Sequence, residues 1–280
     1  METFGARLAR ALRQRGPLCV GIDPHTALLH QWGLTDTVDG LARFCEIATS
    51  ALAGVVPVIK PQSAFFERFG SAGIAVLEST IRQCHAGGAM VLLDVKRGDI
   101  GSTAAAYAEA YLHPGSSLAV DAITVSPYLG FGALAPFLDL AAATGRGVFV
   151  LALTSNPEGA QVQHARGADG RTVAQALLDQ VALRNLDATP MGSVGVVIGA
   201  TTGSTGHDLS RLNGPVLAPG LGAQGATAAD LAEVFGQLRG MVLPSSSREI
   251  LAAGPDPERL RTAAERSFTE CRKVLNYPDS

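Results

Sequence analysis

The sequence predicts a (β/α)8 barrel, and three observations support this fold. Short runs rich in Val, Ile and Leu recur eight times, and they lack the alternation of a strand with one face in water. Segments with the apolar spacing of amphipathic helices lie between them, so that strand and helix alternate. Eight such units in roughly 250 residues fit this barrel, whereas open doubly wound sheets usually have about five or six strands.

The expected strands are near-continuous in branched aliphatic residues, as in parallel strands covered on both faces. They are LCVGID from residue 18, VVPVIKP from 55, AMVLLDVK from 89, AITVSP from 122, GVFVLAL from 147, SVGVVIG from 193, PVLAPGL from 215 and GMVLPSSS from 240.

Amphipathic helices are expected over residues 39–53, 72–86, 103–112, 171–186 and 227–238, and a leading helix is expected from the spacing of Phe4, Leu8 and Leu12. The Gly-rich stretch after the sixth strand, GATTGSTGHD, lacks the GK[ST] ending of a phosphate-binding loop and predicts a turn and a helix start. Residues 154–172, rich in Gly, Asn and Pro, predict a long loop after the fifth strand. No linker marks a second domain, so we expect residues 1–280 to form one domain.

Composition excludes several classes of protein. Hydrophobic residues make up 47% of the chain, enough for a large core, while the charged fraction of 17% and the net charge of −3 do not suggest a nucleic-acid partner. No stretch reaches the ~18 apolar residues of a membrane span. The four cysteines and six histidines lack metal-ligand spacing, so we expect no metal site and a cytoplasmic protein with free thiols and a small-molecule partner.

Polar residues follow the apolar runs, where the active site of such a barrel forms. Asp94 and Lys96 are two positions apart, so both side chains would face the barrel mouth. Lys60 ends the neighbouring strand, and Asp23 follows the first strand. Charged groups at a barrel mouth can be purely structural, but desolvating several of them together is costly unless function requires it.

A phosphate site is expected after the last two strands, in PGLGAQGAT and SSSREIL. Glycines there expose backbone N–H groups, and Arg248 offers a fork of donors suited to phosphate. The alternative for Arg248 is a surface arginine at the start of a helix.

The residues quoted above resemble the orotidine 5'-phosphate decarboxylase family. The resemblance rests on Asp94-x-Lys96-x-x-Asp99-Ile-Gly-x-Thr103, on Asp23 and Lys60, and on Gly-Ala-Gln224-Gly followed by Arg248. It spans the whole barrel and is strongest to the longer bacterial branch. One departure is Ser247, where the commoner branch has glycine, and the 154–172 loop has no counterpart in the compact branch.

The resemblance implies decarboxylation of orotidine 5'-phosphate to uridine 5'-phosphate without a cofactor, in a homodimer with shared sites. Lys96 would protonate C6, Asp94 would face the departing carboxylate, and Lys60 and Asp99 would join the charge network. The remaining implied roles concern substrate binding: ribose for Asp23 and Lys60, the partner's ribose for Asp99 and Thr103, the pyrimidine edge for Ser126, a bridge between pyrimidine and phosphate for Gln224, and the phosphate end for Gly225 and Arg248.

Three alternatives stay open. A metal-dependent sugar-phosphate decarboxylase or aldolase can share the Asp-x-Lys-x-x-Asp pattern on the same barrel. A Schiff-base aldolase could use Lys60 or Lys96. A catalytically silent protein that binds a phosphate ligand is the third reading, and the intact set of Lys and Asp residues argues against it.

Overall fold

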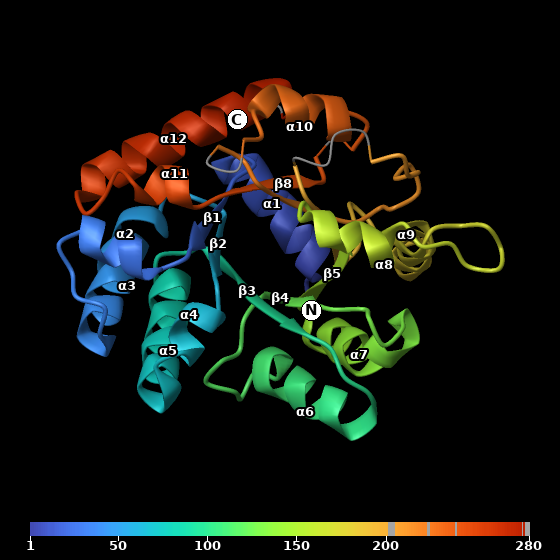
Figure 1. The fold of residues 1–280 in the computed structure, drawn as a ribbon, viewed down its shortest axis with the longest axis horizontal. Coiled ribbons are helices and arrows are strands. Elements are labelled where there is room, and N and C mark those ends of the chain that lie inside the picture. Colours follow the sequence, from blue (N-terminus) through green and yellow to red (C-terminus); the bar gives the residue numbers. More distant parts are fainter. Residues whose placement is uncertain (201–204, 223–224, 239, 276, 278–280) are drawn as a thin grey trace.

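Eight parallel strands close into a barrel in sequence order (Figure 1), in a computed structural model that describes the chain apart from residues 201–204, 223–224, 239, 276 and 278–280. Each strand coincides with one of the predicted runs, with β3 extending one residue past its run to Arg97, which confirms the (β/α)8 prediction. The strands are β1 (Cys19–Ile22), β2 (Val58–Pro61), β3 (Met90–Arg97), β4 (Ala122–Val125), β5 (Gly147–Leu153), β6 (Val194–Ile198), β7 (Val216–Pro219) and β8 (Val242–Ser246).

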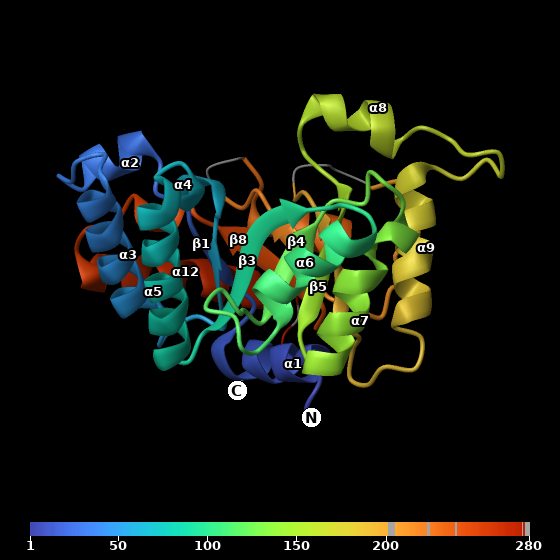
Figure 2. The same cartoon turned by 90° about the horizontal axis from the view of Figure 1, so that it is seen from below.

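Helices form the layer around the barrel, as Figures 1 and 2 show. The longer ones are α1 (Phe4–Arg15), α3 (Val38–Leu52), α5 (Gly70–Ala86), α6 (Gly101–Leu112), α7 (Ala135–Thr144), α9 (Val173–Arg184), α10 (Ala228–Phe235) and α12 (Pro257–Val274). Shorter helical segments lie in the connections between these elements: α2 (Thr26–Gln31), α4 (Ala64–Glu67), η1 (Phe131–Leu134), η2 (Pro157–Gly159), α8 (Ala160–Gln163) and α11 (Arg248–Leu251).

One expected helix is absent from the described chain. Between β6 and β7, residues 199–200 and 205–215 contain no helix, so the prediction of a helix start in GATTGSTGHD is wrong for this part of the loop. The stretch is rich in Gly, Ser, Thr and Asn, whose side chains and flexibility favour turns over helix. Strand–helix alternation is therefore incomplete at this point of the barrel.

Helix α1 lies across the end of the barrel opposite the 154–172 loop, as Figure 2 shows. Its Phe4 ring packs edge-on against Phe149 of β5, with 5.9 Å between centroids. A Cβ at Gly147 would lie 2.3 Å from the Phe4 ring, so the absence of a side chain there allows this packing. Helix α1 thereby closes the end of the barrel away from the strands' carboxyl ends.

A polar cluster fixes α1 to the barrel through Asp121, which directly precedes β4. Its carboxylate accepts hydrogen bonds from Arg7 Nη1 at 2.5 Å and from the backbone N–H of Val91 at 2.8 Å. The Nε2 atom of His85 lies 3.0 Å from the same carboxylate. Burial alone would raise the pKa of Asp121, but hydrogen bonds from His85, Val91 and Arg7 lower it to about 2.

A bulge in β3 shapes the other end of the barrel. Leu93 pairs with Ile123 of β4, and the next pairing joins Arg97 to Val125. Four steps along β3 thus match two steps along β4, so β3 carries two extra residues between these pairs. Asp94 and Lys96 lie within this bulge, opposite Thr124.

Candidate active site

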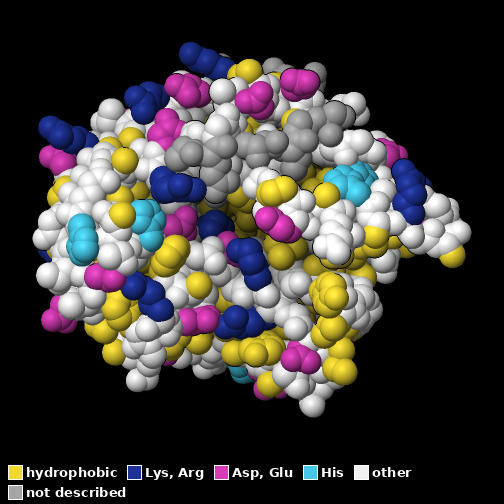
Figure 3. All heavy atoms as spheres, in the orientation of Figure 1, with side chains coloured by type: hydrophobic (Ala, Val, Ile, Leu, Met, Phe, Trp, Pro, Cys, Tyr) yellow, Lys and Arg dark blue, Asp and Glu magenta, His cyan; other side chains and the backbone are white. Residues whose placement is uncertain are grey.

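A cavity of about 700 Å³ opens at the carboxyl ends of the strands. Asp23, Lys60, Asp94, Lys96 and Arg248 all line it, as their positions after the predicted strands led us to expect. Figure 3 shows this face as a hollow in which basic and acidic side chains gather. The structure therefore brings together, in one cavity, five charged residues from four separate segments of the sequence.

Asp94 is the centre of the charge network. Its Oδ2 atom lies 3.1 Å from Lys60 Nζ, and its Oδ1 atom lies 2.6 Å from Lys96 Nζ. Lys60 Nζ is also 4.0 Å from Asp23 Oδ1. The Lys60 and Asp94 side chains are buried, whereas that of Lys96 is 46% exposed and can reach a molecule in the cavity.

The pKa values of Asp94 and Lys60 are shifted in the directions that favour their ionised forms. Burial alone would raise the pKa of Asp94, but Lys60 and Lys96 hold it well below its usual range. Burial alone would lower the pKa of Lys60, but the negative charges of Asp94 and Asp23 raise it above its ordinary value. Each group is thus stabilised in its ionised form by the others.

The backbone of Lys96 is held in an uncommon conformation. Its φ of +45° lies in the left-handed region, which costs a residue other than glycine about 1–3 kcal/mol. The Lys96 N–H donates a hydrogen bond of 2.9 Å to Thr124 Oγ1, which fixes the bulge. The strained backbone therefore belongs to the same residue whose ammonium contacts Asp94.

The opposite wall of the cavity is apolar. Leu151 and Leu153 of β5, Val197 of β6 and Leu217 of β7 line it. Charges in a cavity with such a wall interact more strongly than in water, because the effective dielectric constant is lower. The site therefore places a fixed ammonium–carboxylate pair opposite a surface that solvates an anionic group poorly.

Arg248 begins α11 at the edge of the cavity, beside Ser247. Its side chain is exposed and, within the described parts of the chain, makes no hydrogen bond or ion pair. It is therefore available to a ligand. Gly225 has a positive φ of 96° and its N–H donates to Gly222 O at 2.7 Å, while Gln224 lies outside the described residues.

Four of the predicted site residues that the structure describes, Asp99, Thr103, Ser126 and Gly225, do not line the cavity of their own chain. Asp99 Oδ1 accepts a hydrogen bond from the N–H of Ile100 at 2.8 Å, and Thr103 is exposed in the first turn of α6. Ser126 follows β4, and its N–H donates to Arg97 O at 2.8 Å. Ser155, after β5, lines the cavity instead.

Two cavity residues gave no signal in the sequence. Thr124 reads as an ordinary β-branched strand residue, and Gln62 as the start of a loop. In the structure, Thr124 Oγ1 donates to Asp94 Oδ1 at 2.7 Å, and Gln62 Nε2 donates to Asp94 O at 3.4 Å. His25 also lines the cavity, and its Nδ1 accepts a hydrogen bond from the N–H of Leu28 at 3.3 Å.

The 154–172 loop is joined to the cavity at its first residue. Thr154, which lines the cavity, donates its N–H to Gln163 Oε1 at 3.0 Å and accepts from Gln163 Nε2 at 2.8 Å. At the far end, Thr172 Oγ1 lies 2.7 Å from His207 Nε2. Figure 2 shows α8 of this loop projecting beyond the strands.

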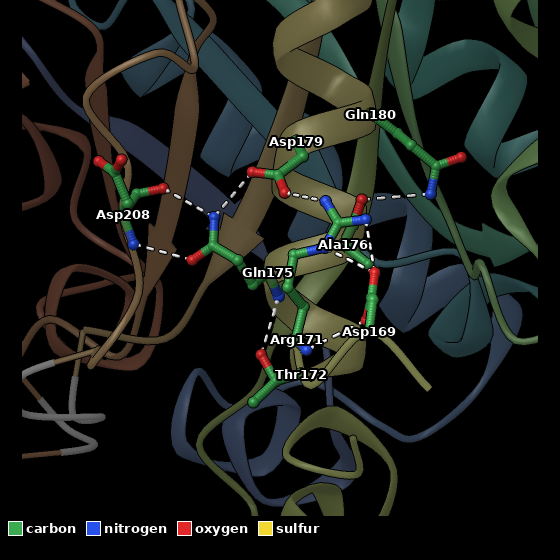
Figure 4. Close-up of polar contacts among 8 residues, drawn as sticks. All are labelled: Asp169, Arg171, Thr172, Gln175, Ala176, Asp179, Gln180 and Asp208. Atoms are coloured by element: carbon green, nitrogen blue, oxygen red, sulfur yellow. Dashed lines mark hydrogen bonds and ion pairs between the residues drawn. The ribbon is translucent and has the colours of Figure 1, made fainter. Parts of the chain in front are cut away.

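The start of α9 ties this loop to the loop after β6. The side-chain amide of Gln175 exchanges two hydrogen bonds with the backbone of Asp208, at 2.9 and 3.2 Å (Figure 4). Arg171 forms ion pairs with Asp169 at 2.7 Å and Asp179 at 2.5 Å. Both loops are therefore held in place by contacts outside the cavity.

The fold and cavity are those of a (β/α)8-barrel enzyme with a lysine–carboxylate network among the residues that line its cavity. Residues 16–263 match the model of the Orotidine 5'-phosphate decarboxylase / HUMPS family, and the chain belongs to this family. No helix among the described residues is long and apolar enough to cross a membrane.

Individual relatives are similar over nearly the full chain. The orotidine 5'-phosphate decarboxylase of Salinispora arenicola is 67% identical over 275 residues, which are 98% of this chain and 99% of the relative. That of Streptomyces coelicolor is 58% identical over 276 residues, covering 98% and 99%. The structure of Leishmania donovani OMP decarboxylase superposes with a TM-score of 0.75 at 30% identity, covering 98% of this chain and 99% of that one.

Proposed function

We propose that this protein converts orotidine 5'-phosphate to uridine 5'-phosphate and CO2, the last step of de novo pyrimidine nucleotide synthesis. The observation that carries the proposal is the Lys60–Asp94–Lys96 network in a cavity that ends at Arg248, in a member of this family. The full-length relatives at 58–67% identity carry this activity in their names. A cytoplasmic location is part of the proposal.

The reaction breaks the bond between C6 and the carboxylate carbon, and the electron pair stays on C6. CO2 leaves, and the ammonium of Lys96 transfers a proton to C6 and is later reprotonated from water. The vinyl carbanion at C6 has no adjacent electron sink, so the cation already placed in the cavity must stabilise it. The fixed position of Lys96 beside Asp94 suits this role.

Asp94 is proposed to face the substrate carboxylate. Since the network keeps Asp94 ionised, the two like charges repel, and this repulsion is relieved as CO2 leaves. The apolar wall from β5 to β7 receives neutral CO2 more readily than it receives a carboxylate.

Electrostatics at C6 is not sufficient alone. A charge pair at ~4 Å is of order 4 kcal/mol at an effective dielectric constant near 20, about three powers of ten in rate. Very slow reference reactions need ~20 kcal/mol of barrier lowering. The phosphoribosyl group must therefore contribute through binding that is realised in the transition state.

Substrate binding is proposed for residues of the same cavity and, at the phosphate end, also for the loop after β7. Asp23 and Lys60 are proposed to hold the ribose hydroxyls, and Arg248 the phosphate, with Gln224 and the Gly225 backbone beside it. We keep Ser126 as a candidate for the pyrimidine edge, but Ser155 is better placed because it lines the cavity.

A homodimer with shared sites is also proposed. Asp99 and Thr103 lie outside the cavity of their own chain, next to exposed apolar side chains at Ile100 (62%), Tyr128 (78%) and Leu129 (53%). The loops that carry them are adjacent, since Ser126 N–H donates to Arg97 O. An exposed apolar patch of this kind is typical of an interface.

Complementation tests the shared site. Mixing Asp99→Ala with Lys96→Ala subunits should restore activity, because a mixed dimer contains one site with both native residues. If the mixture is no more active than its two components, Asp99 does not act across an interface.

The function itself is tested with purified protein and orotidine 5'-phosphate, by following the loss of substrate absorbance with and without EDTA. Turnover that EDTA leaves unchanged is the expected result. No turnover, or loss of activity with EDTA, would favour the metal-dependent sugar-phosphate alternative. Borohydride trapping with substrate tests the Schiff-base aldolase, for which we expect no adduct.

A further inference from the structure

Thr124 of β4 closes a ring of hydrogen bonds around the two central residues of the site. Its Oγ1 donates to Asp94 Oδ1 at 2.7 Å and accepts from the Lys96 N–H at 2.9 Å. The ring is completed by Lys96 Nζ, 2.6 Å from the same Asp94 Oδ1. One hydroxyl thus touches the backbone of the lysine and the carboxylate that its ammonium contacts.

The bulge in β3 explains why a hydroxyl is needed at this position. Thr124 stands between the paired residues Ile123 and Val125, opposite the two extra residues of β3. The regular ladder is interrupted there, so the N–H of Lys96 bonds to a side chain instead of a strand carbonyl. The hydroxyl takes the place of a ladder acceptor and holds Lys96 at its positive φ.

Other buried threonines behave differently. Thr49 and Thr80 are each 1% exposed, like Thr124, and their hydroxyls donate to the carbonyl four residues earlier in their own helix. Thr49 Oγ1 also lies 2.6 Å from Gln83 Oε1 of α5, and neither threonine lines the cavity. The hydroxyl of Thr124 instead joins two strands at the two residues on which the chemistry depends.

We infer that Thr124 is a positioning residue for the decarboxylation, an inference that rests on the proposed function. Its single hydroxyl proton is committed to Asp94, so it has no proton left to donate to the substrate. It acts through the other two residues by fixing the direction of the Lys96 ammonium relative to C6 and the face that Asp94 presents to the leaving carboxylate.

Substitution of Thr124 separates this role from stability alone. Thr124→Val keeps the shape and removes the hydroxyl, and we expect kcat to fall about ten- to a hundredfold, the usual effect of a lost hydrogen bond to a charged group, with KM within threefold. Thr124→Ser restores the hydroxyl, and its kcat should lie within about threefold of wild type. The matched control is Thr80→Val, which removes an equally buried hydroxyl and should leave kcat unchanged.

The outcomes distinguish the inference from the proposed function. If wild-type protein does not turn over orotidine 5'-phosphate, the proposed function fails. If it does, and Thr124→Val keeps kcat within twofold or Thr124→Ser loses as much as Thr124→Val, the positioning role is wrong. Should the valine variant not fold, Thr124→Cys carries the same prediction, because a thiol is a weak donor and acceptor.

Discussion

Lys60→Met tests whether the buried charges stabilise one another. Methionine keeps an unbranched side chain and removes the ammonium that lies 3.1 Å from Asp94 Oδ2 and 4.0 Å from Asp23 Oδ1. At an effective dielectric constant near 20, these attractions are about 5 and about 4 kcal/mol before desolvation is subtracted. Breaking a buried pair by removing one partner typically costs about 3–5 kcal/mol, which is the loss of stability we expect.

The assay is urea unfolding at pH 7 of wild type, Lys60→Met, Asp94→Asn and the double variant. Each single substitution leaves a charged partner in the cavity, while the double variant removes both members of the pair. The double variant should therefore lose less than the sum of the singles, by at least about 1 kcal/mol. Additivity within about 0.5 kcal/mol would show that the two groups are not coupled, and the reasoning would be refuted.

Three further predictions concern the phosphate site, the pH dependence of catalysis and acid stability. Arg248→Ala should lower kcat/KM about tenfold to a hundredfold or more, mainly by raising KM. Arg266 pairs with Glu249 outside the cavity, so Arg266→Ala serves as the control and should leave kcat/KM unchanged. If both variants lower kcat/KM equally, the assignment of Arg248 to the phosphate is wrong. The pKa of Asp94 is held well below its usual range, so the titration of Asp94 should not change kcat at saturating substrate between about pH 5 and 9. A fall in kcat at the acid end of this pH range that Asp94→Asn abolishes would contradict the proposed network. The pKa of Asp121 is lowered from 3.8 to about 2, so its ionised form adds about 2 kcal/mol to the free energy of unfolding above about pH 4. This contribution is lost as the pH falls to about 2. Asp121→Asn should abolish this pH dependence in urea unfolding.

The barrel could be predicted from the sequence because parallel strands buried on both faces leave unbroken aliphatic runs. The same regularity located the charged side of the site, since Asp23, Lys60 and Asp94 lie toward the carboxyl ends of three consecutive apolar runs and the carboxyl ends of all strands meet at one face. The position of a charged residue within its run therefore predicted that its side chain lies at the mouth of the barrel.

The bulge and its consequences could not be predicted. A run of apolar residues does not indicate that β3 carries two extra residues. The sequence therefore predicted neither the positive φ of Lys96 nor the contacts of Thr124. Ser126 and Ser155 both follow strands, and only their packing shows that the second lines the cavity. In the described residues between β6 and β7 no helix forms, because the stretch is rich in turn-forming residues, and the helix was expected only from the regular alternation of the fold.

Lys96 is the group proposed to stabilise the carbanion and to supply the proton. The direct measurement is kcat for orotidine 5'-phosphate with wild type and Lys96→Ala, together with the Kd of uridine 5'-phosphate for both. We predict that the variant loses at least about three powers of ten in kcat, from the charge term estimated above, while it still binds the product. A variant that decarboxylates within about tenfold of wild type would contradict the proposed role of Lys96.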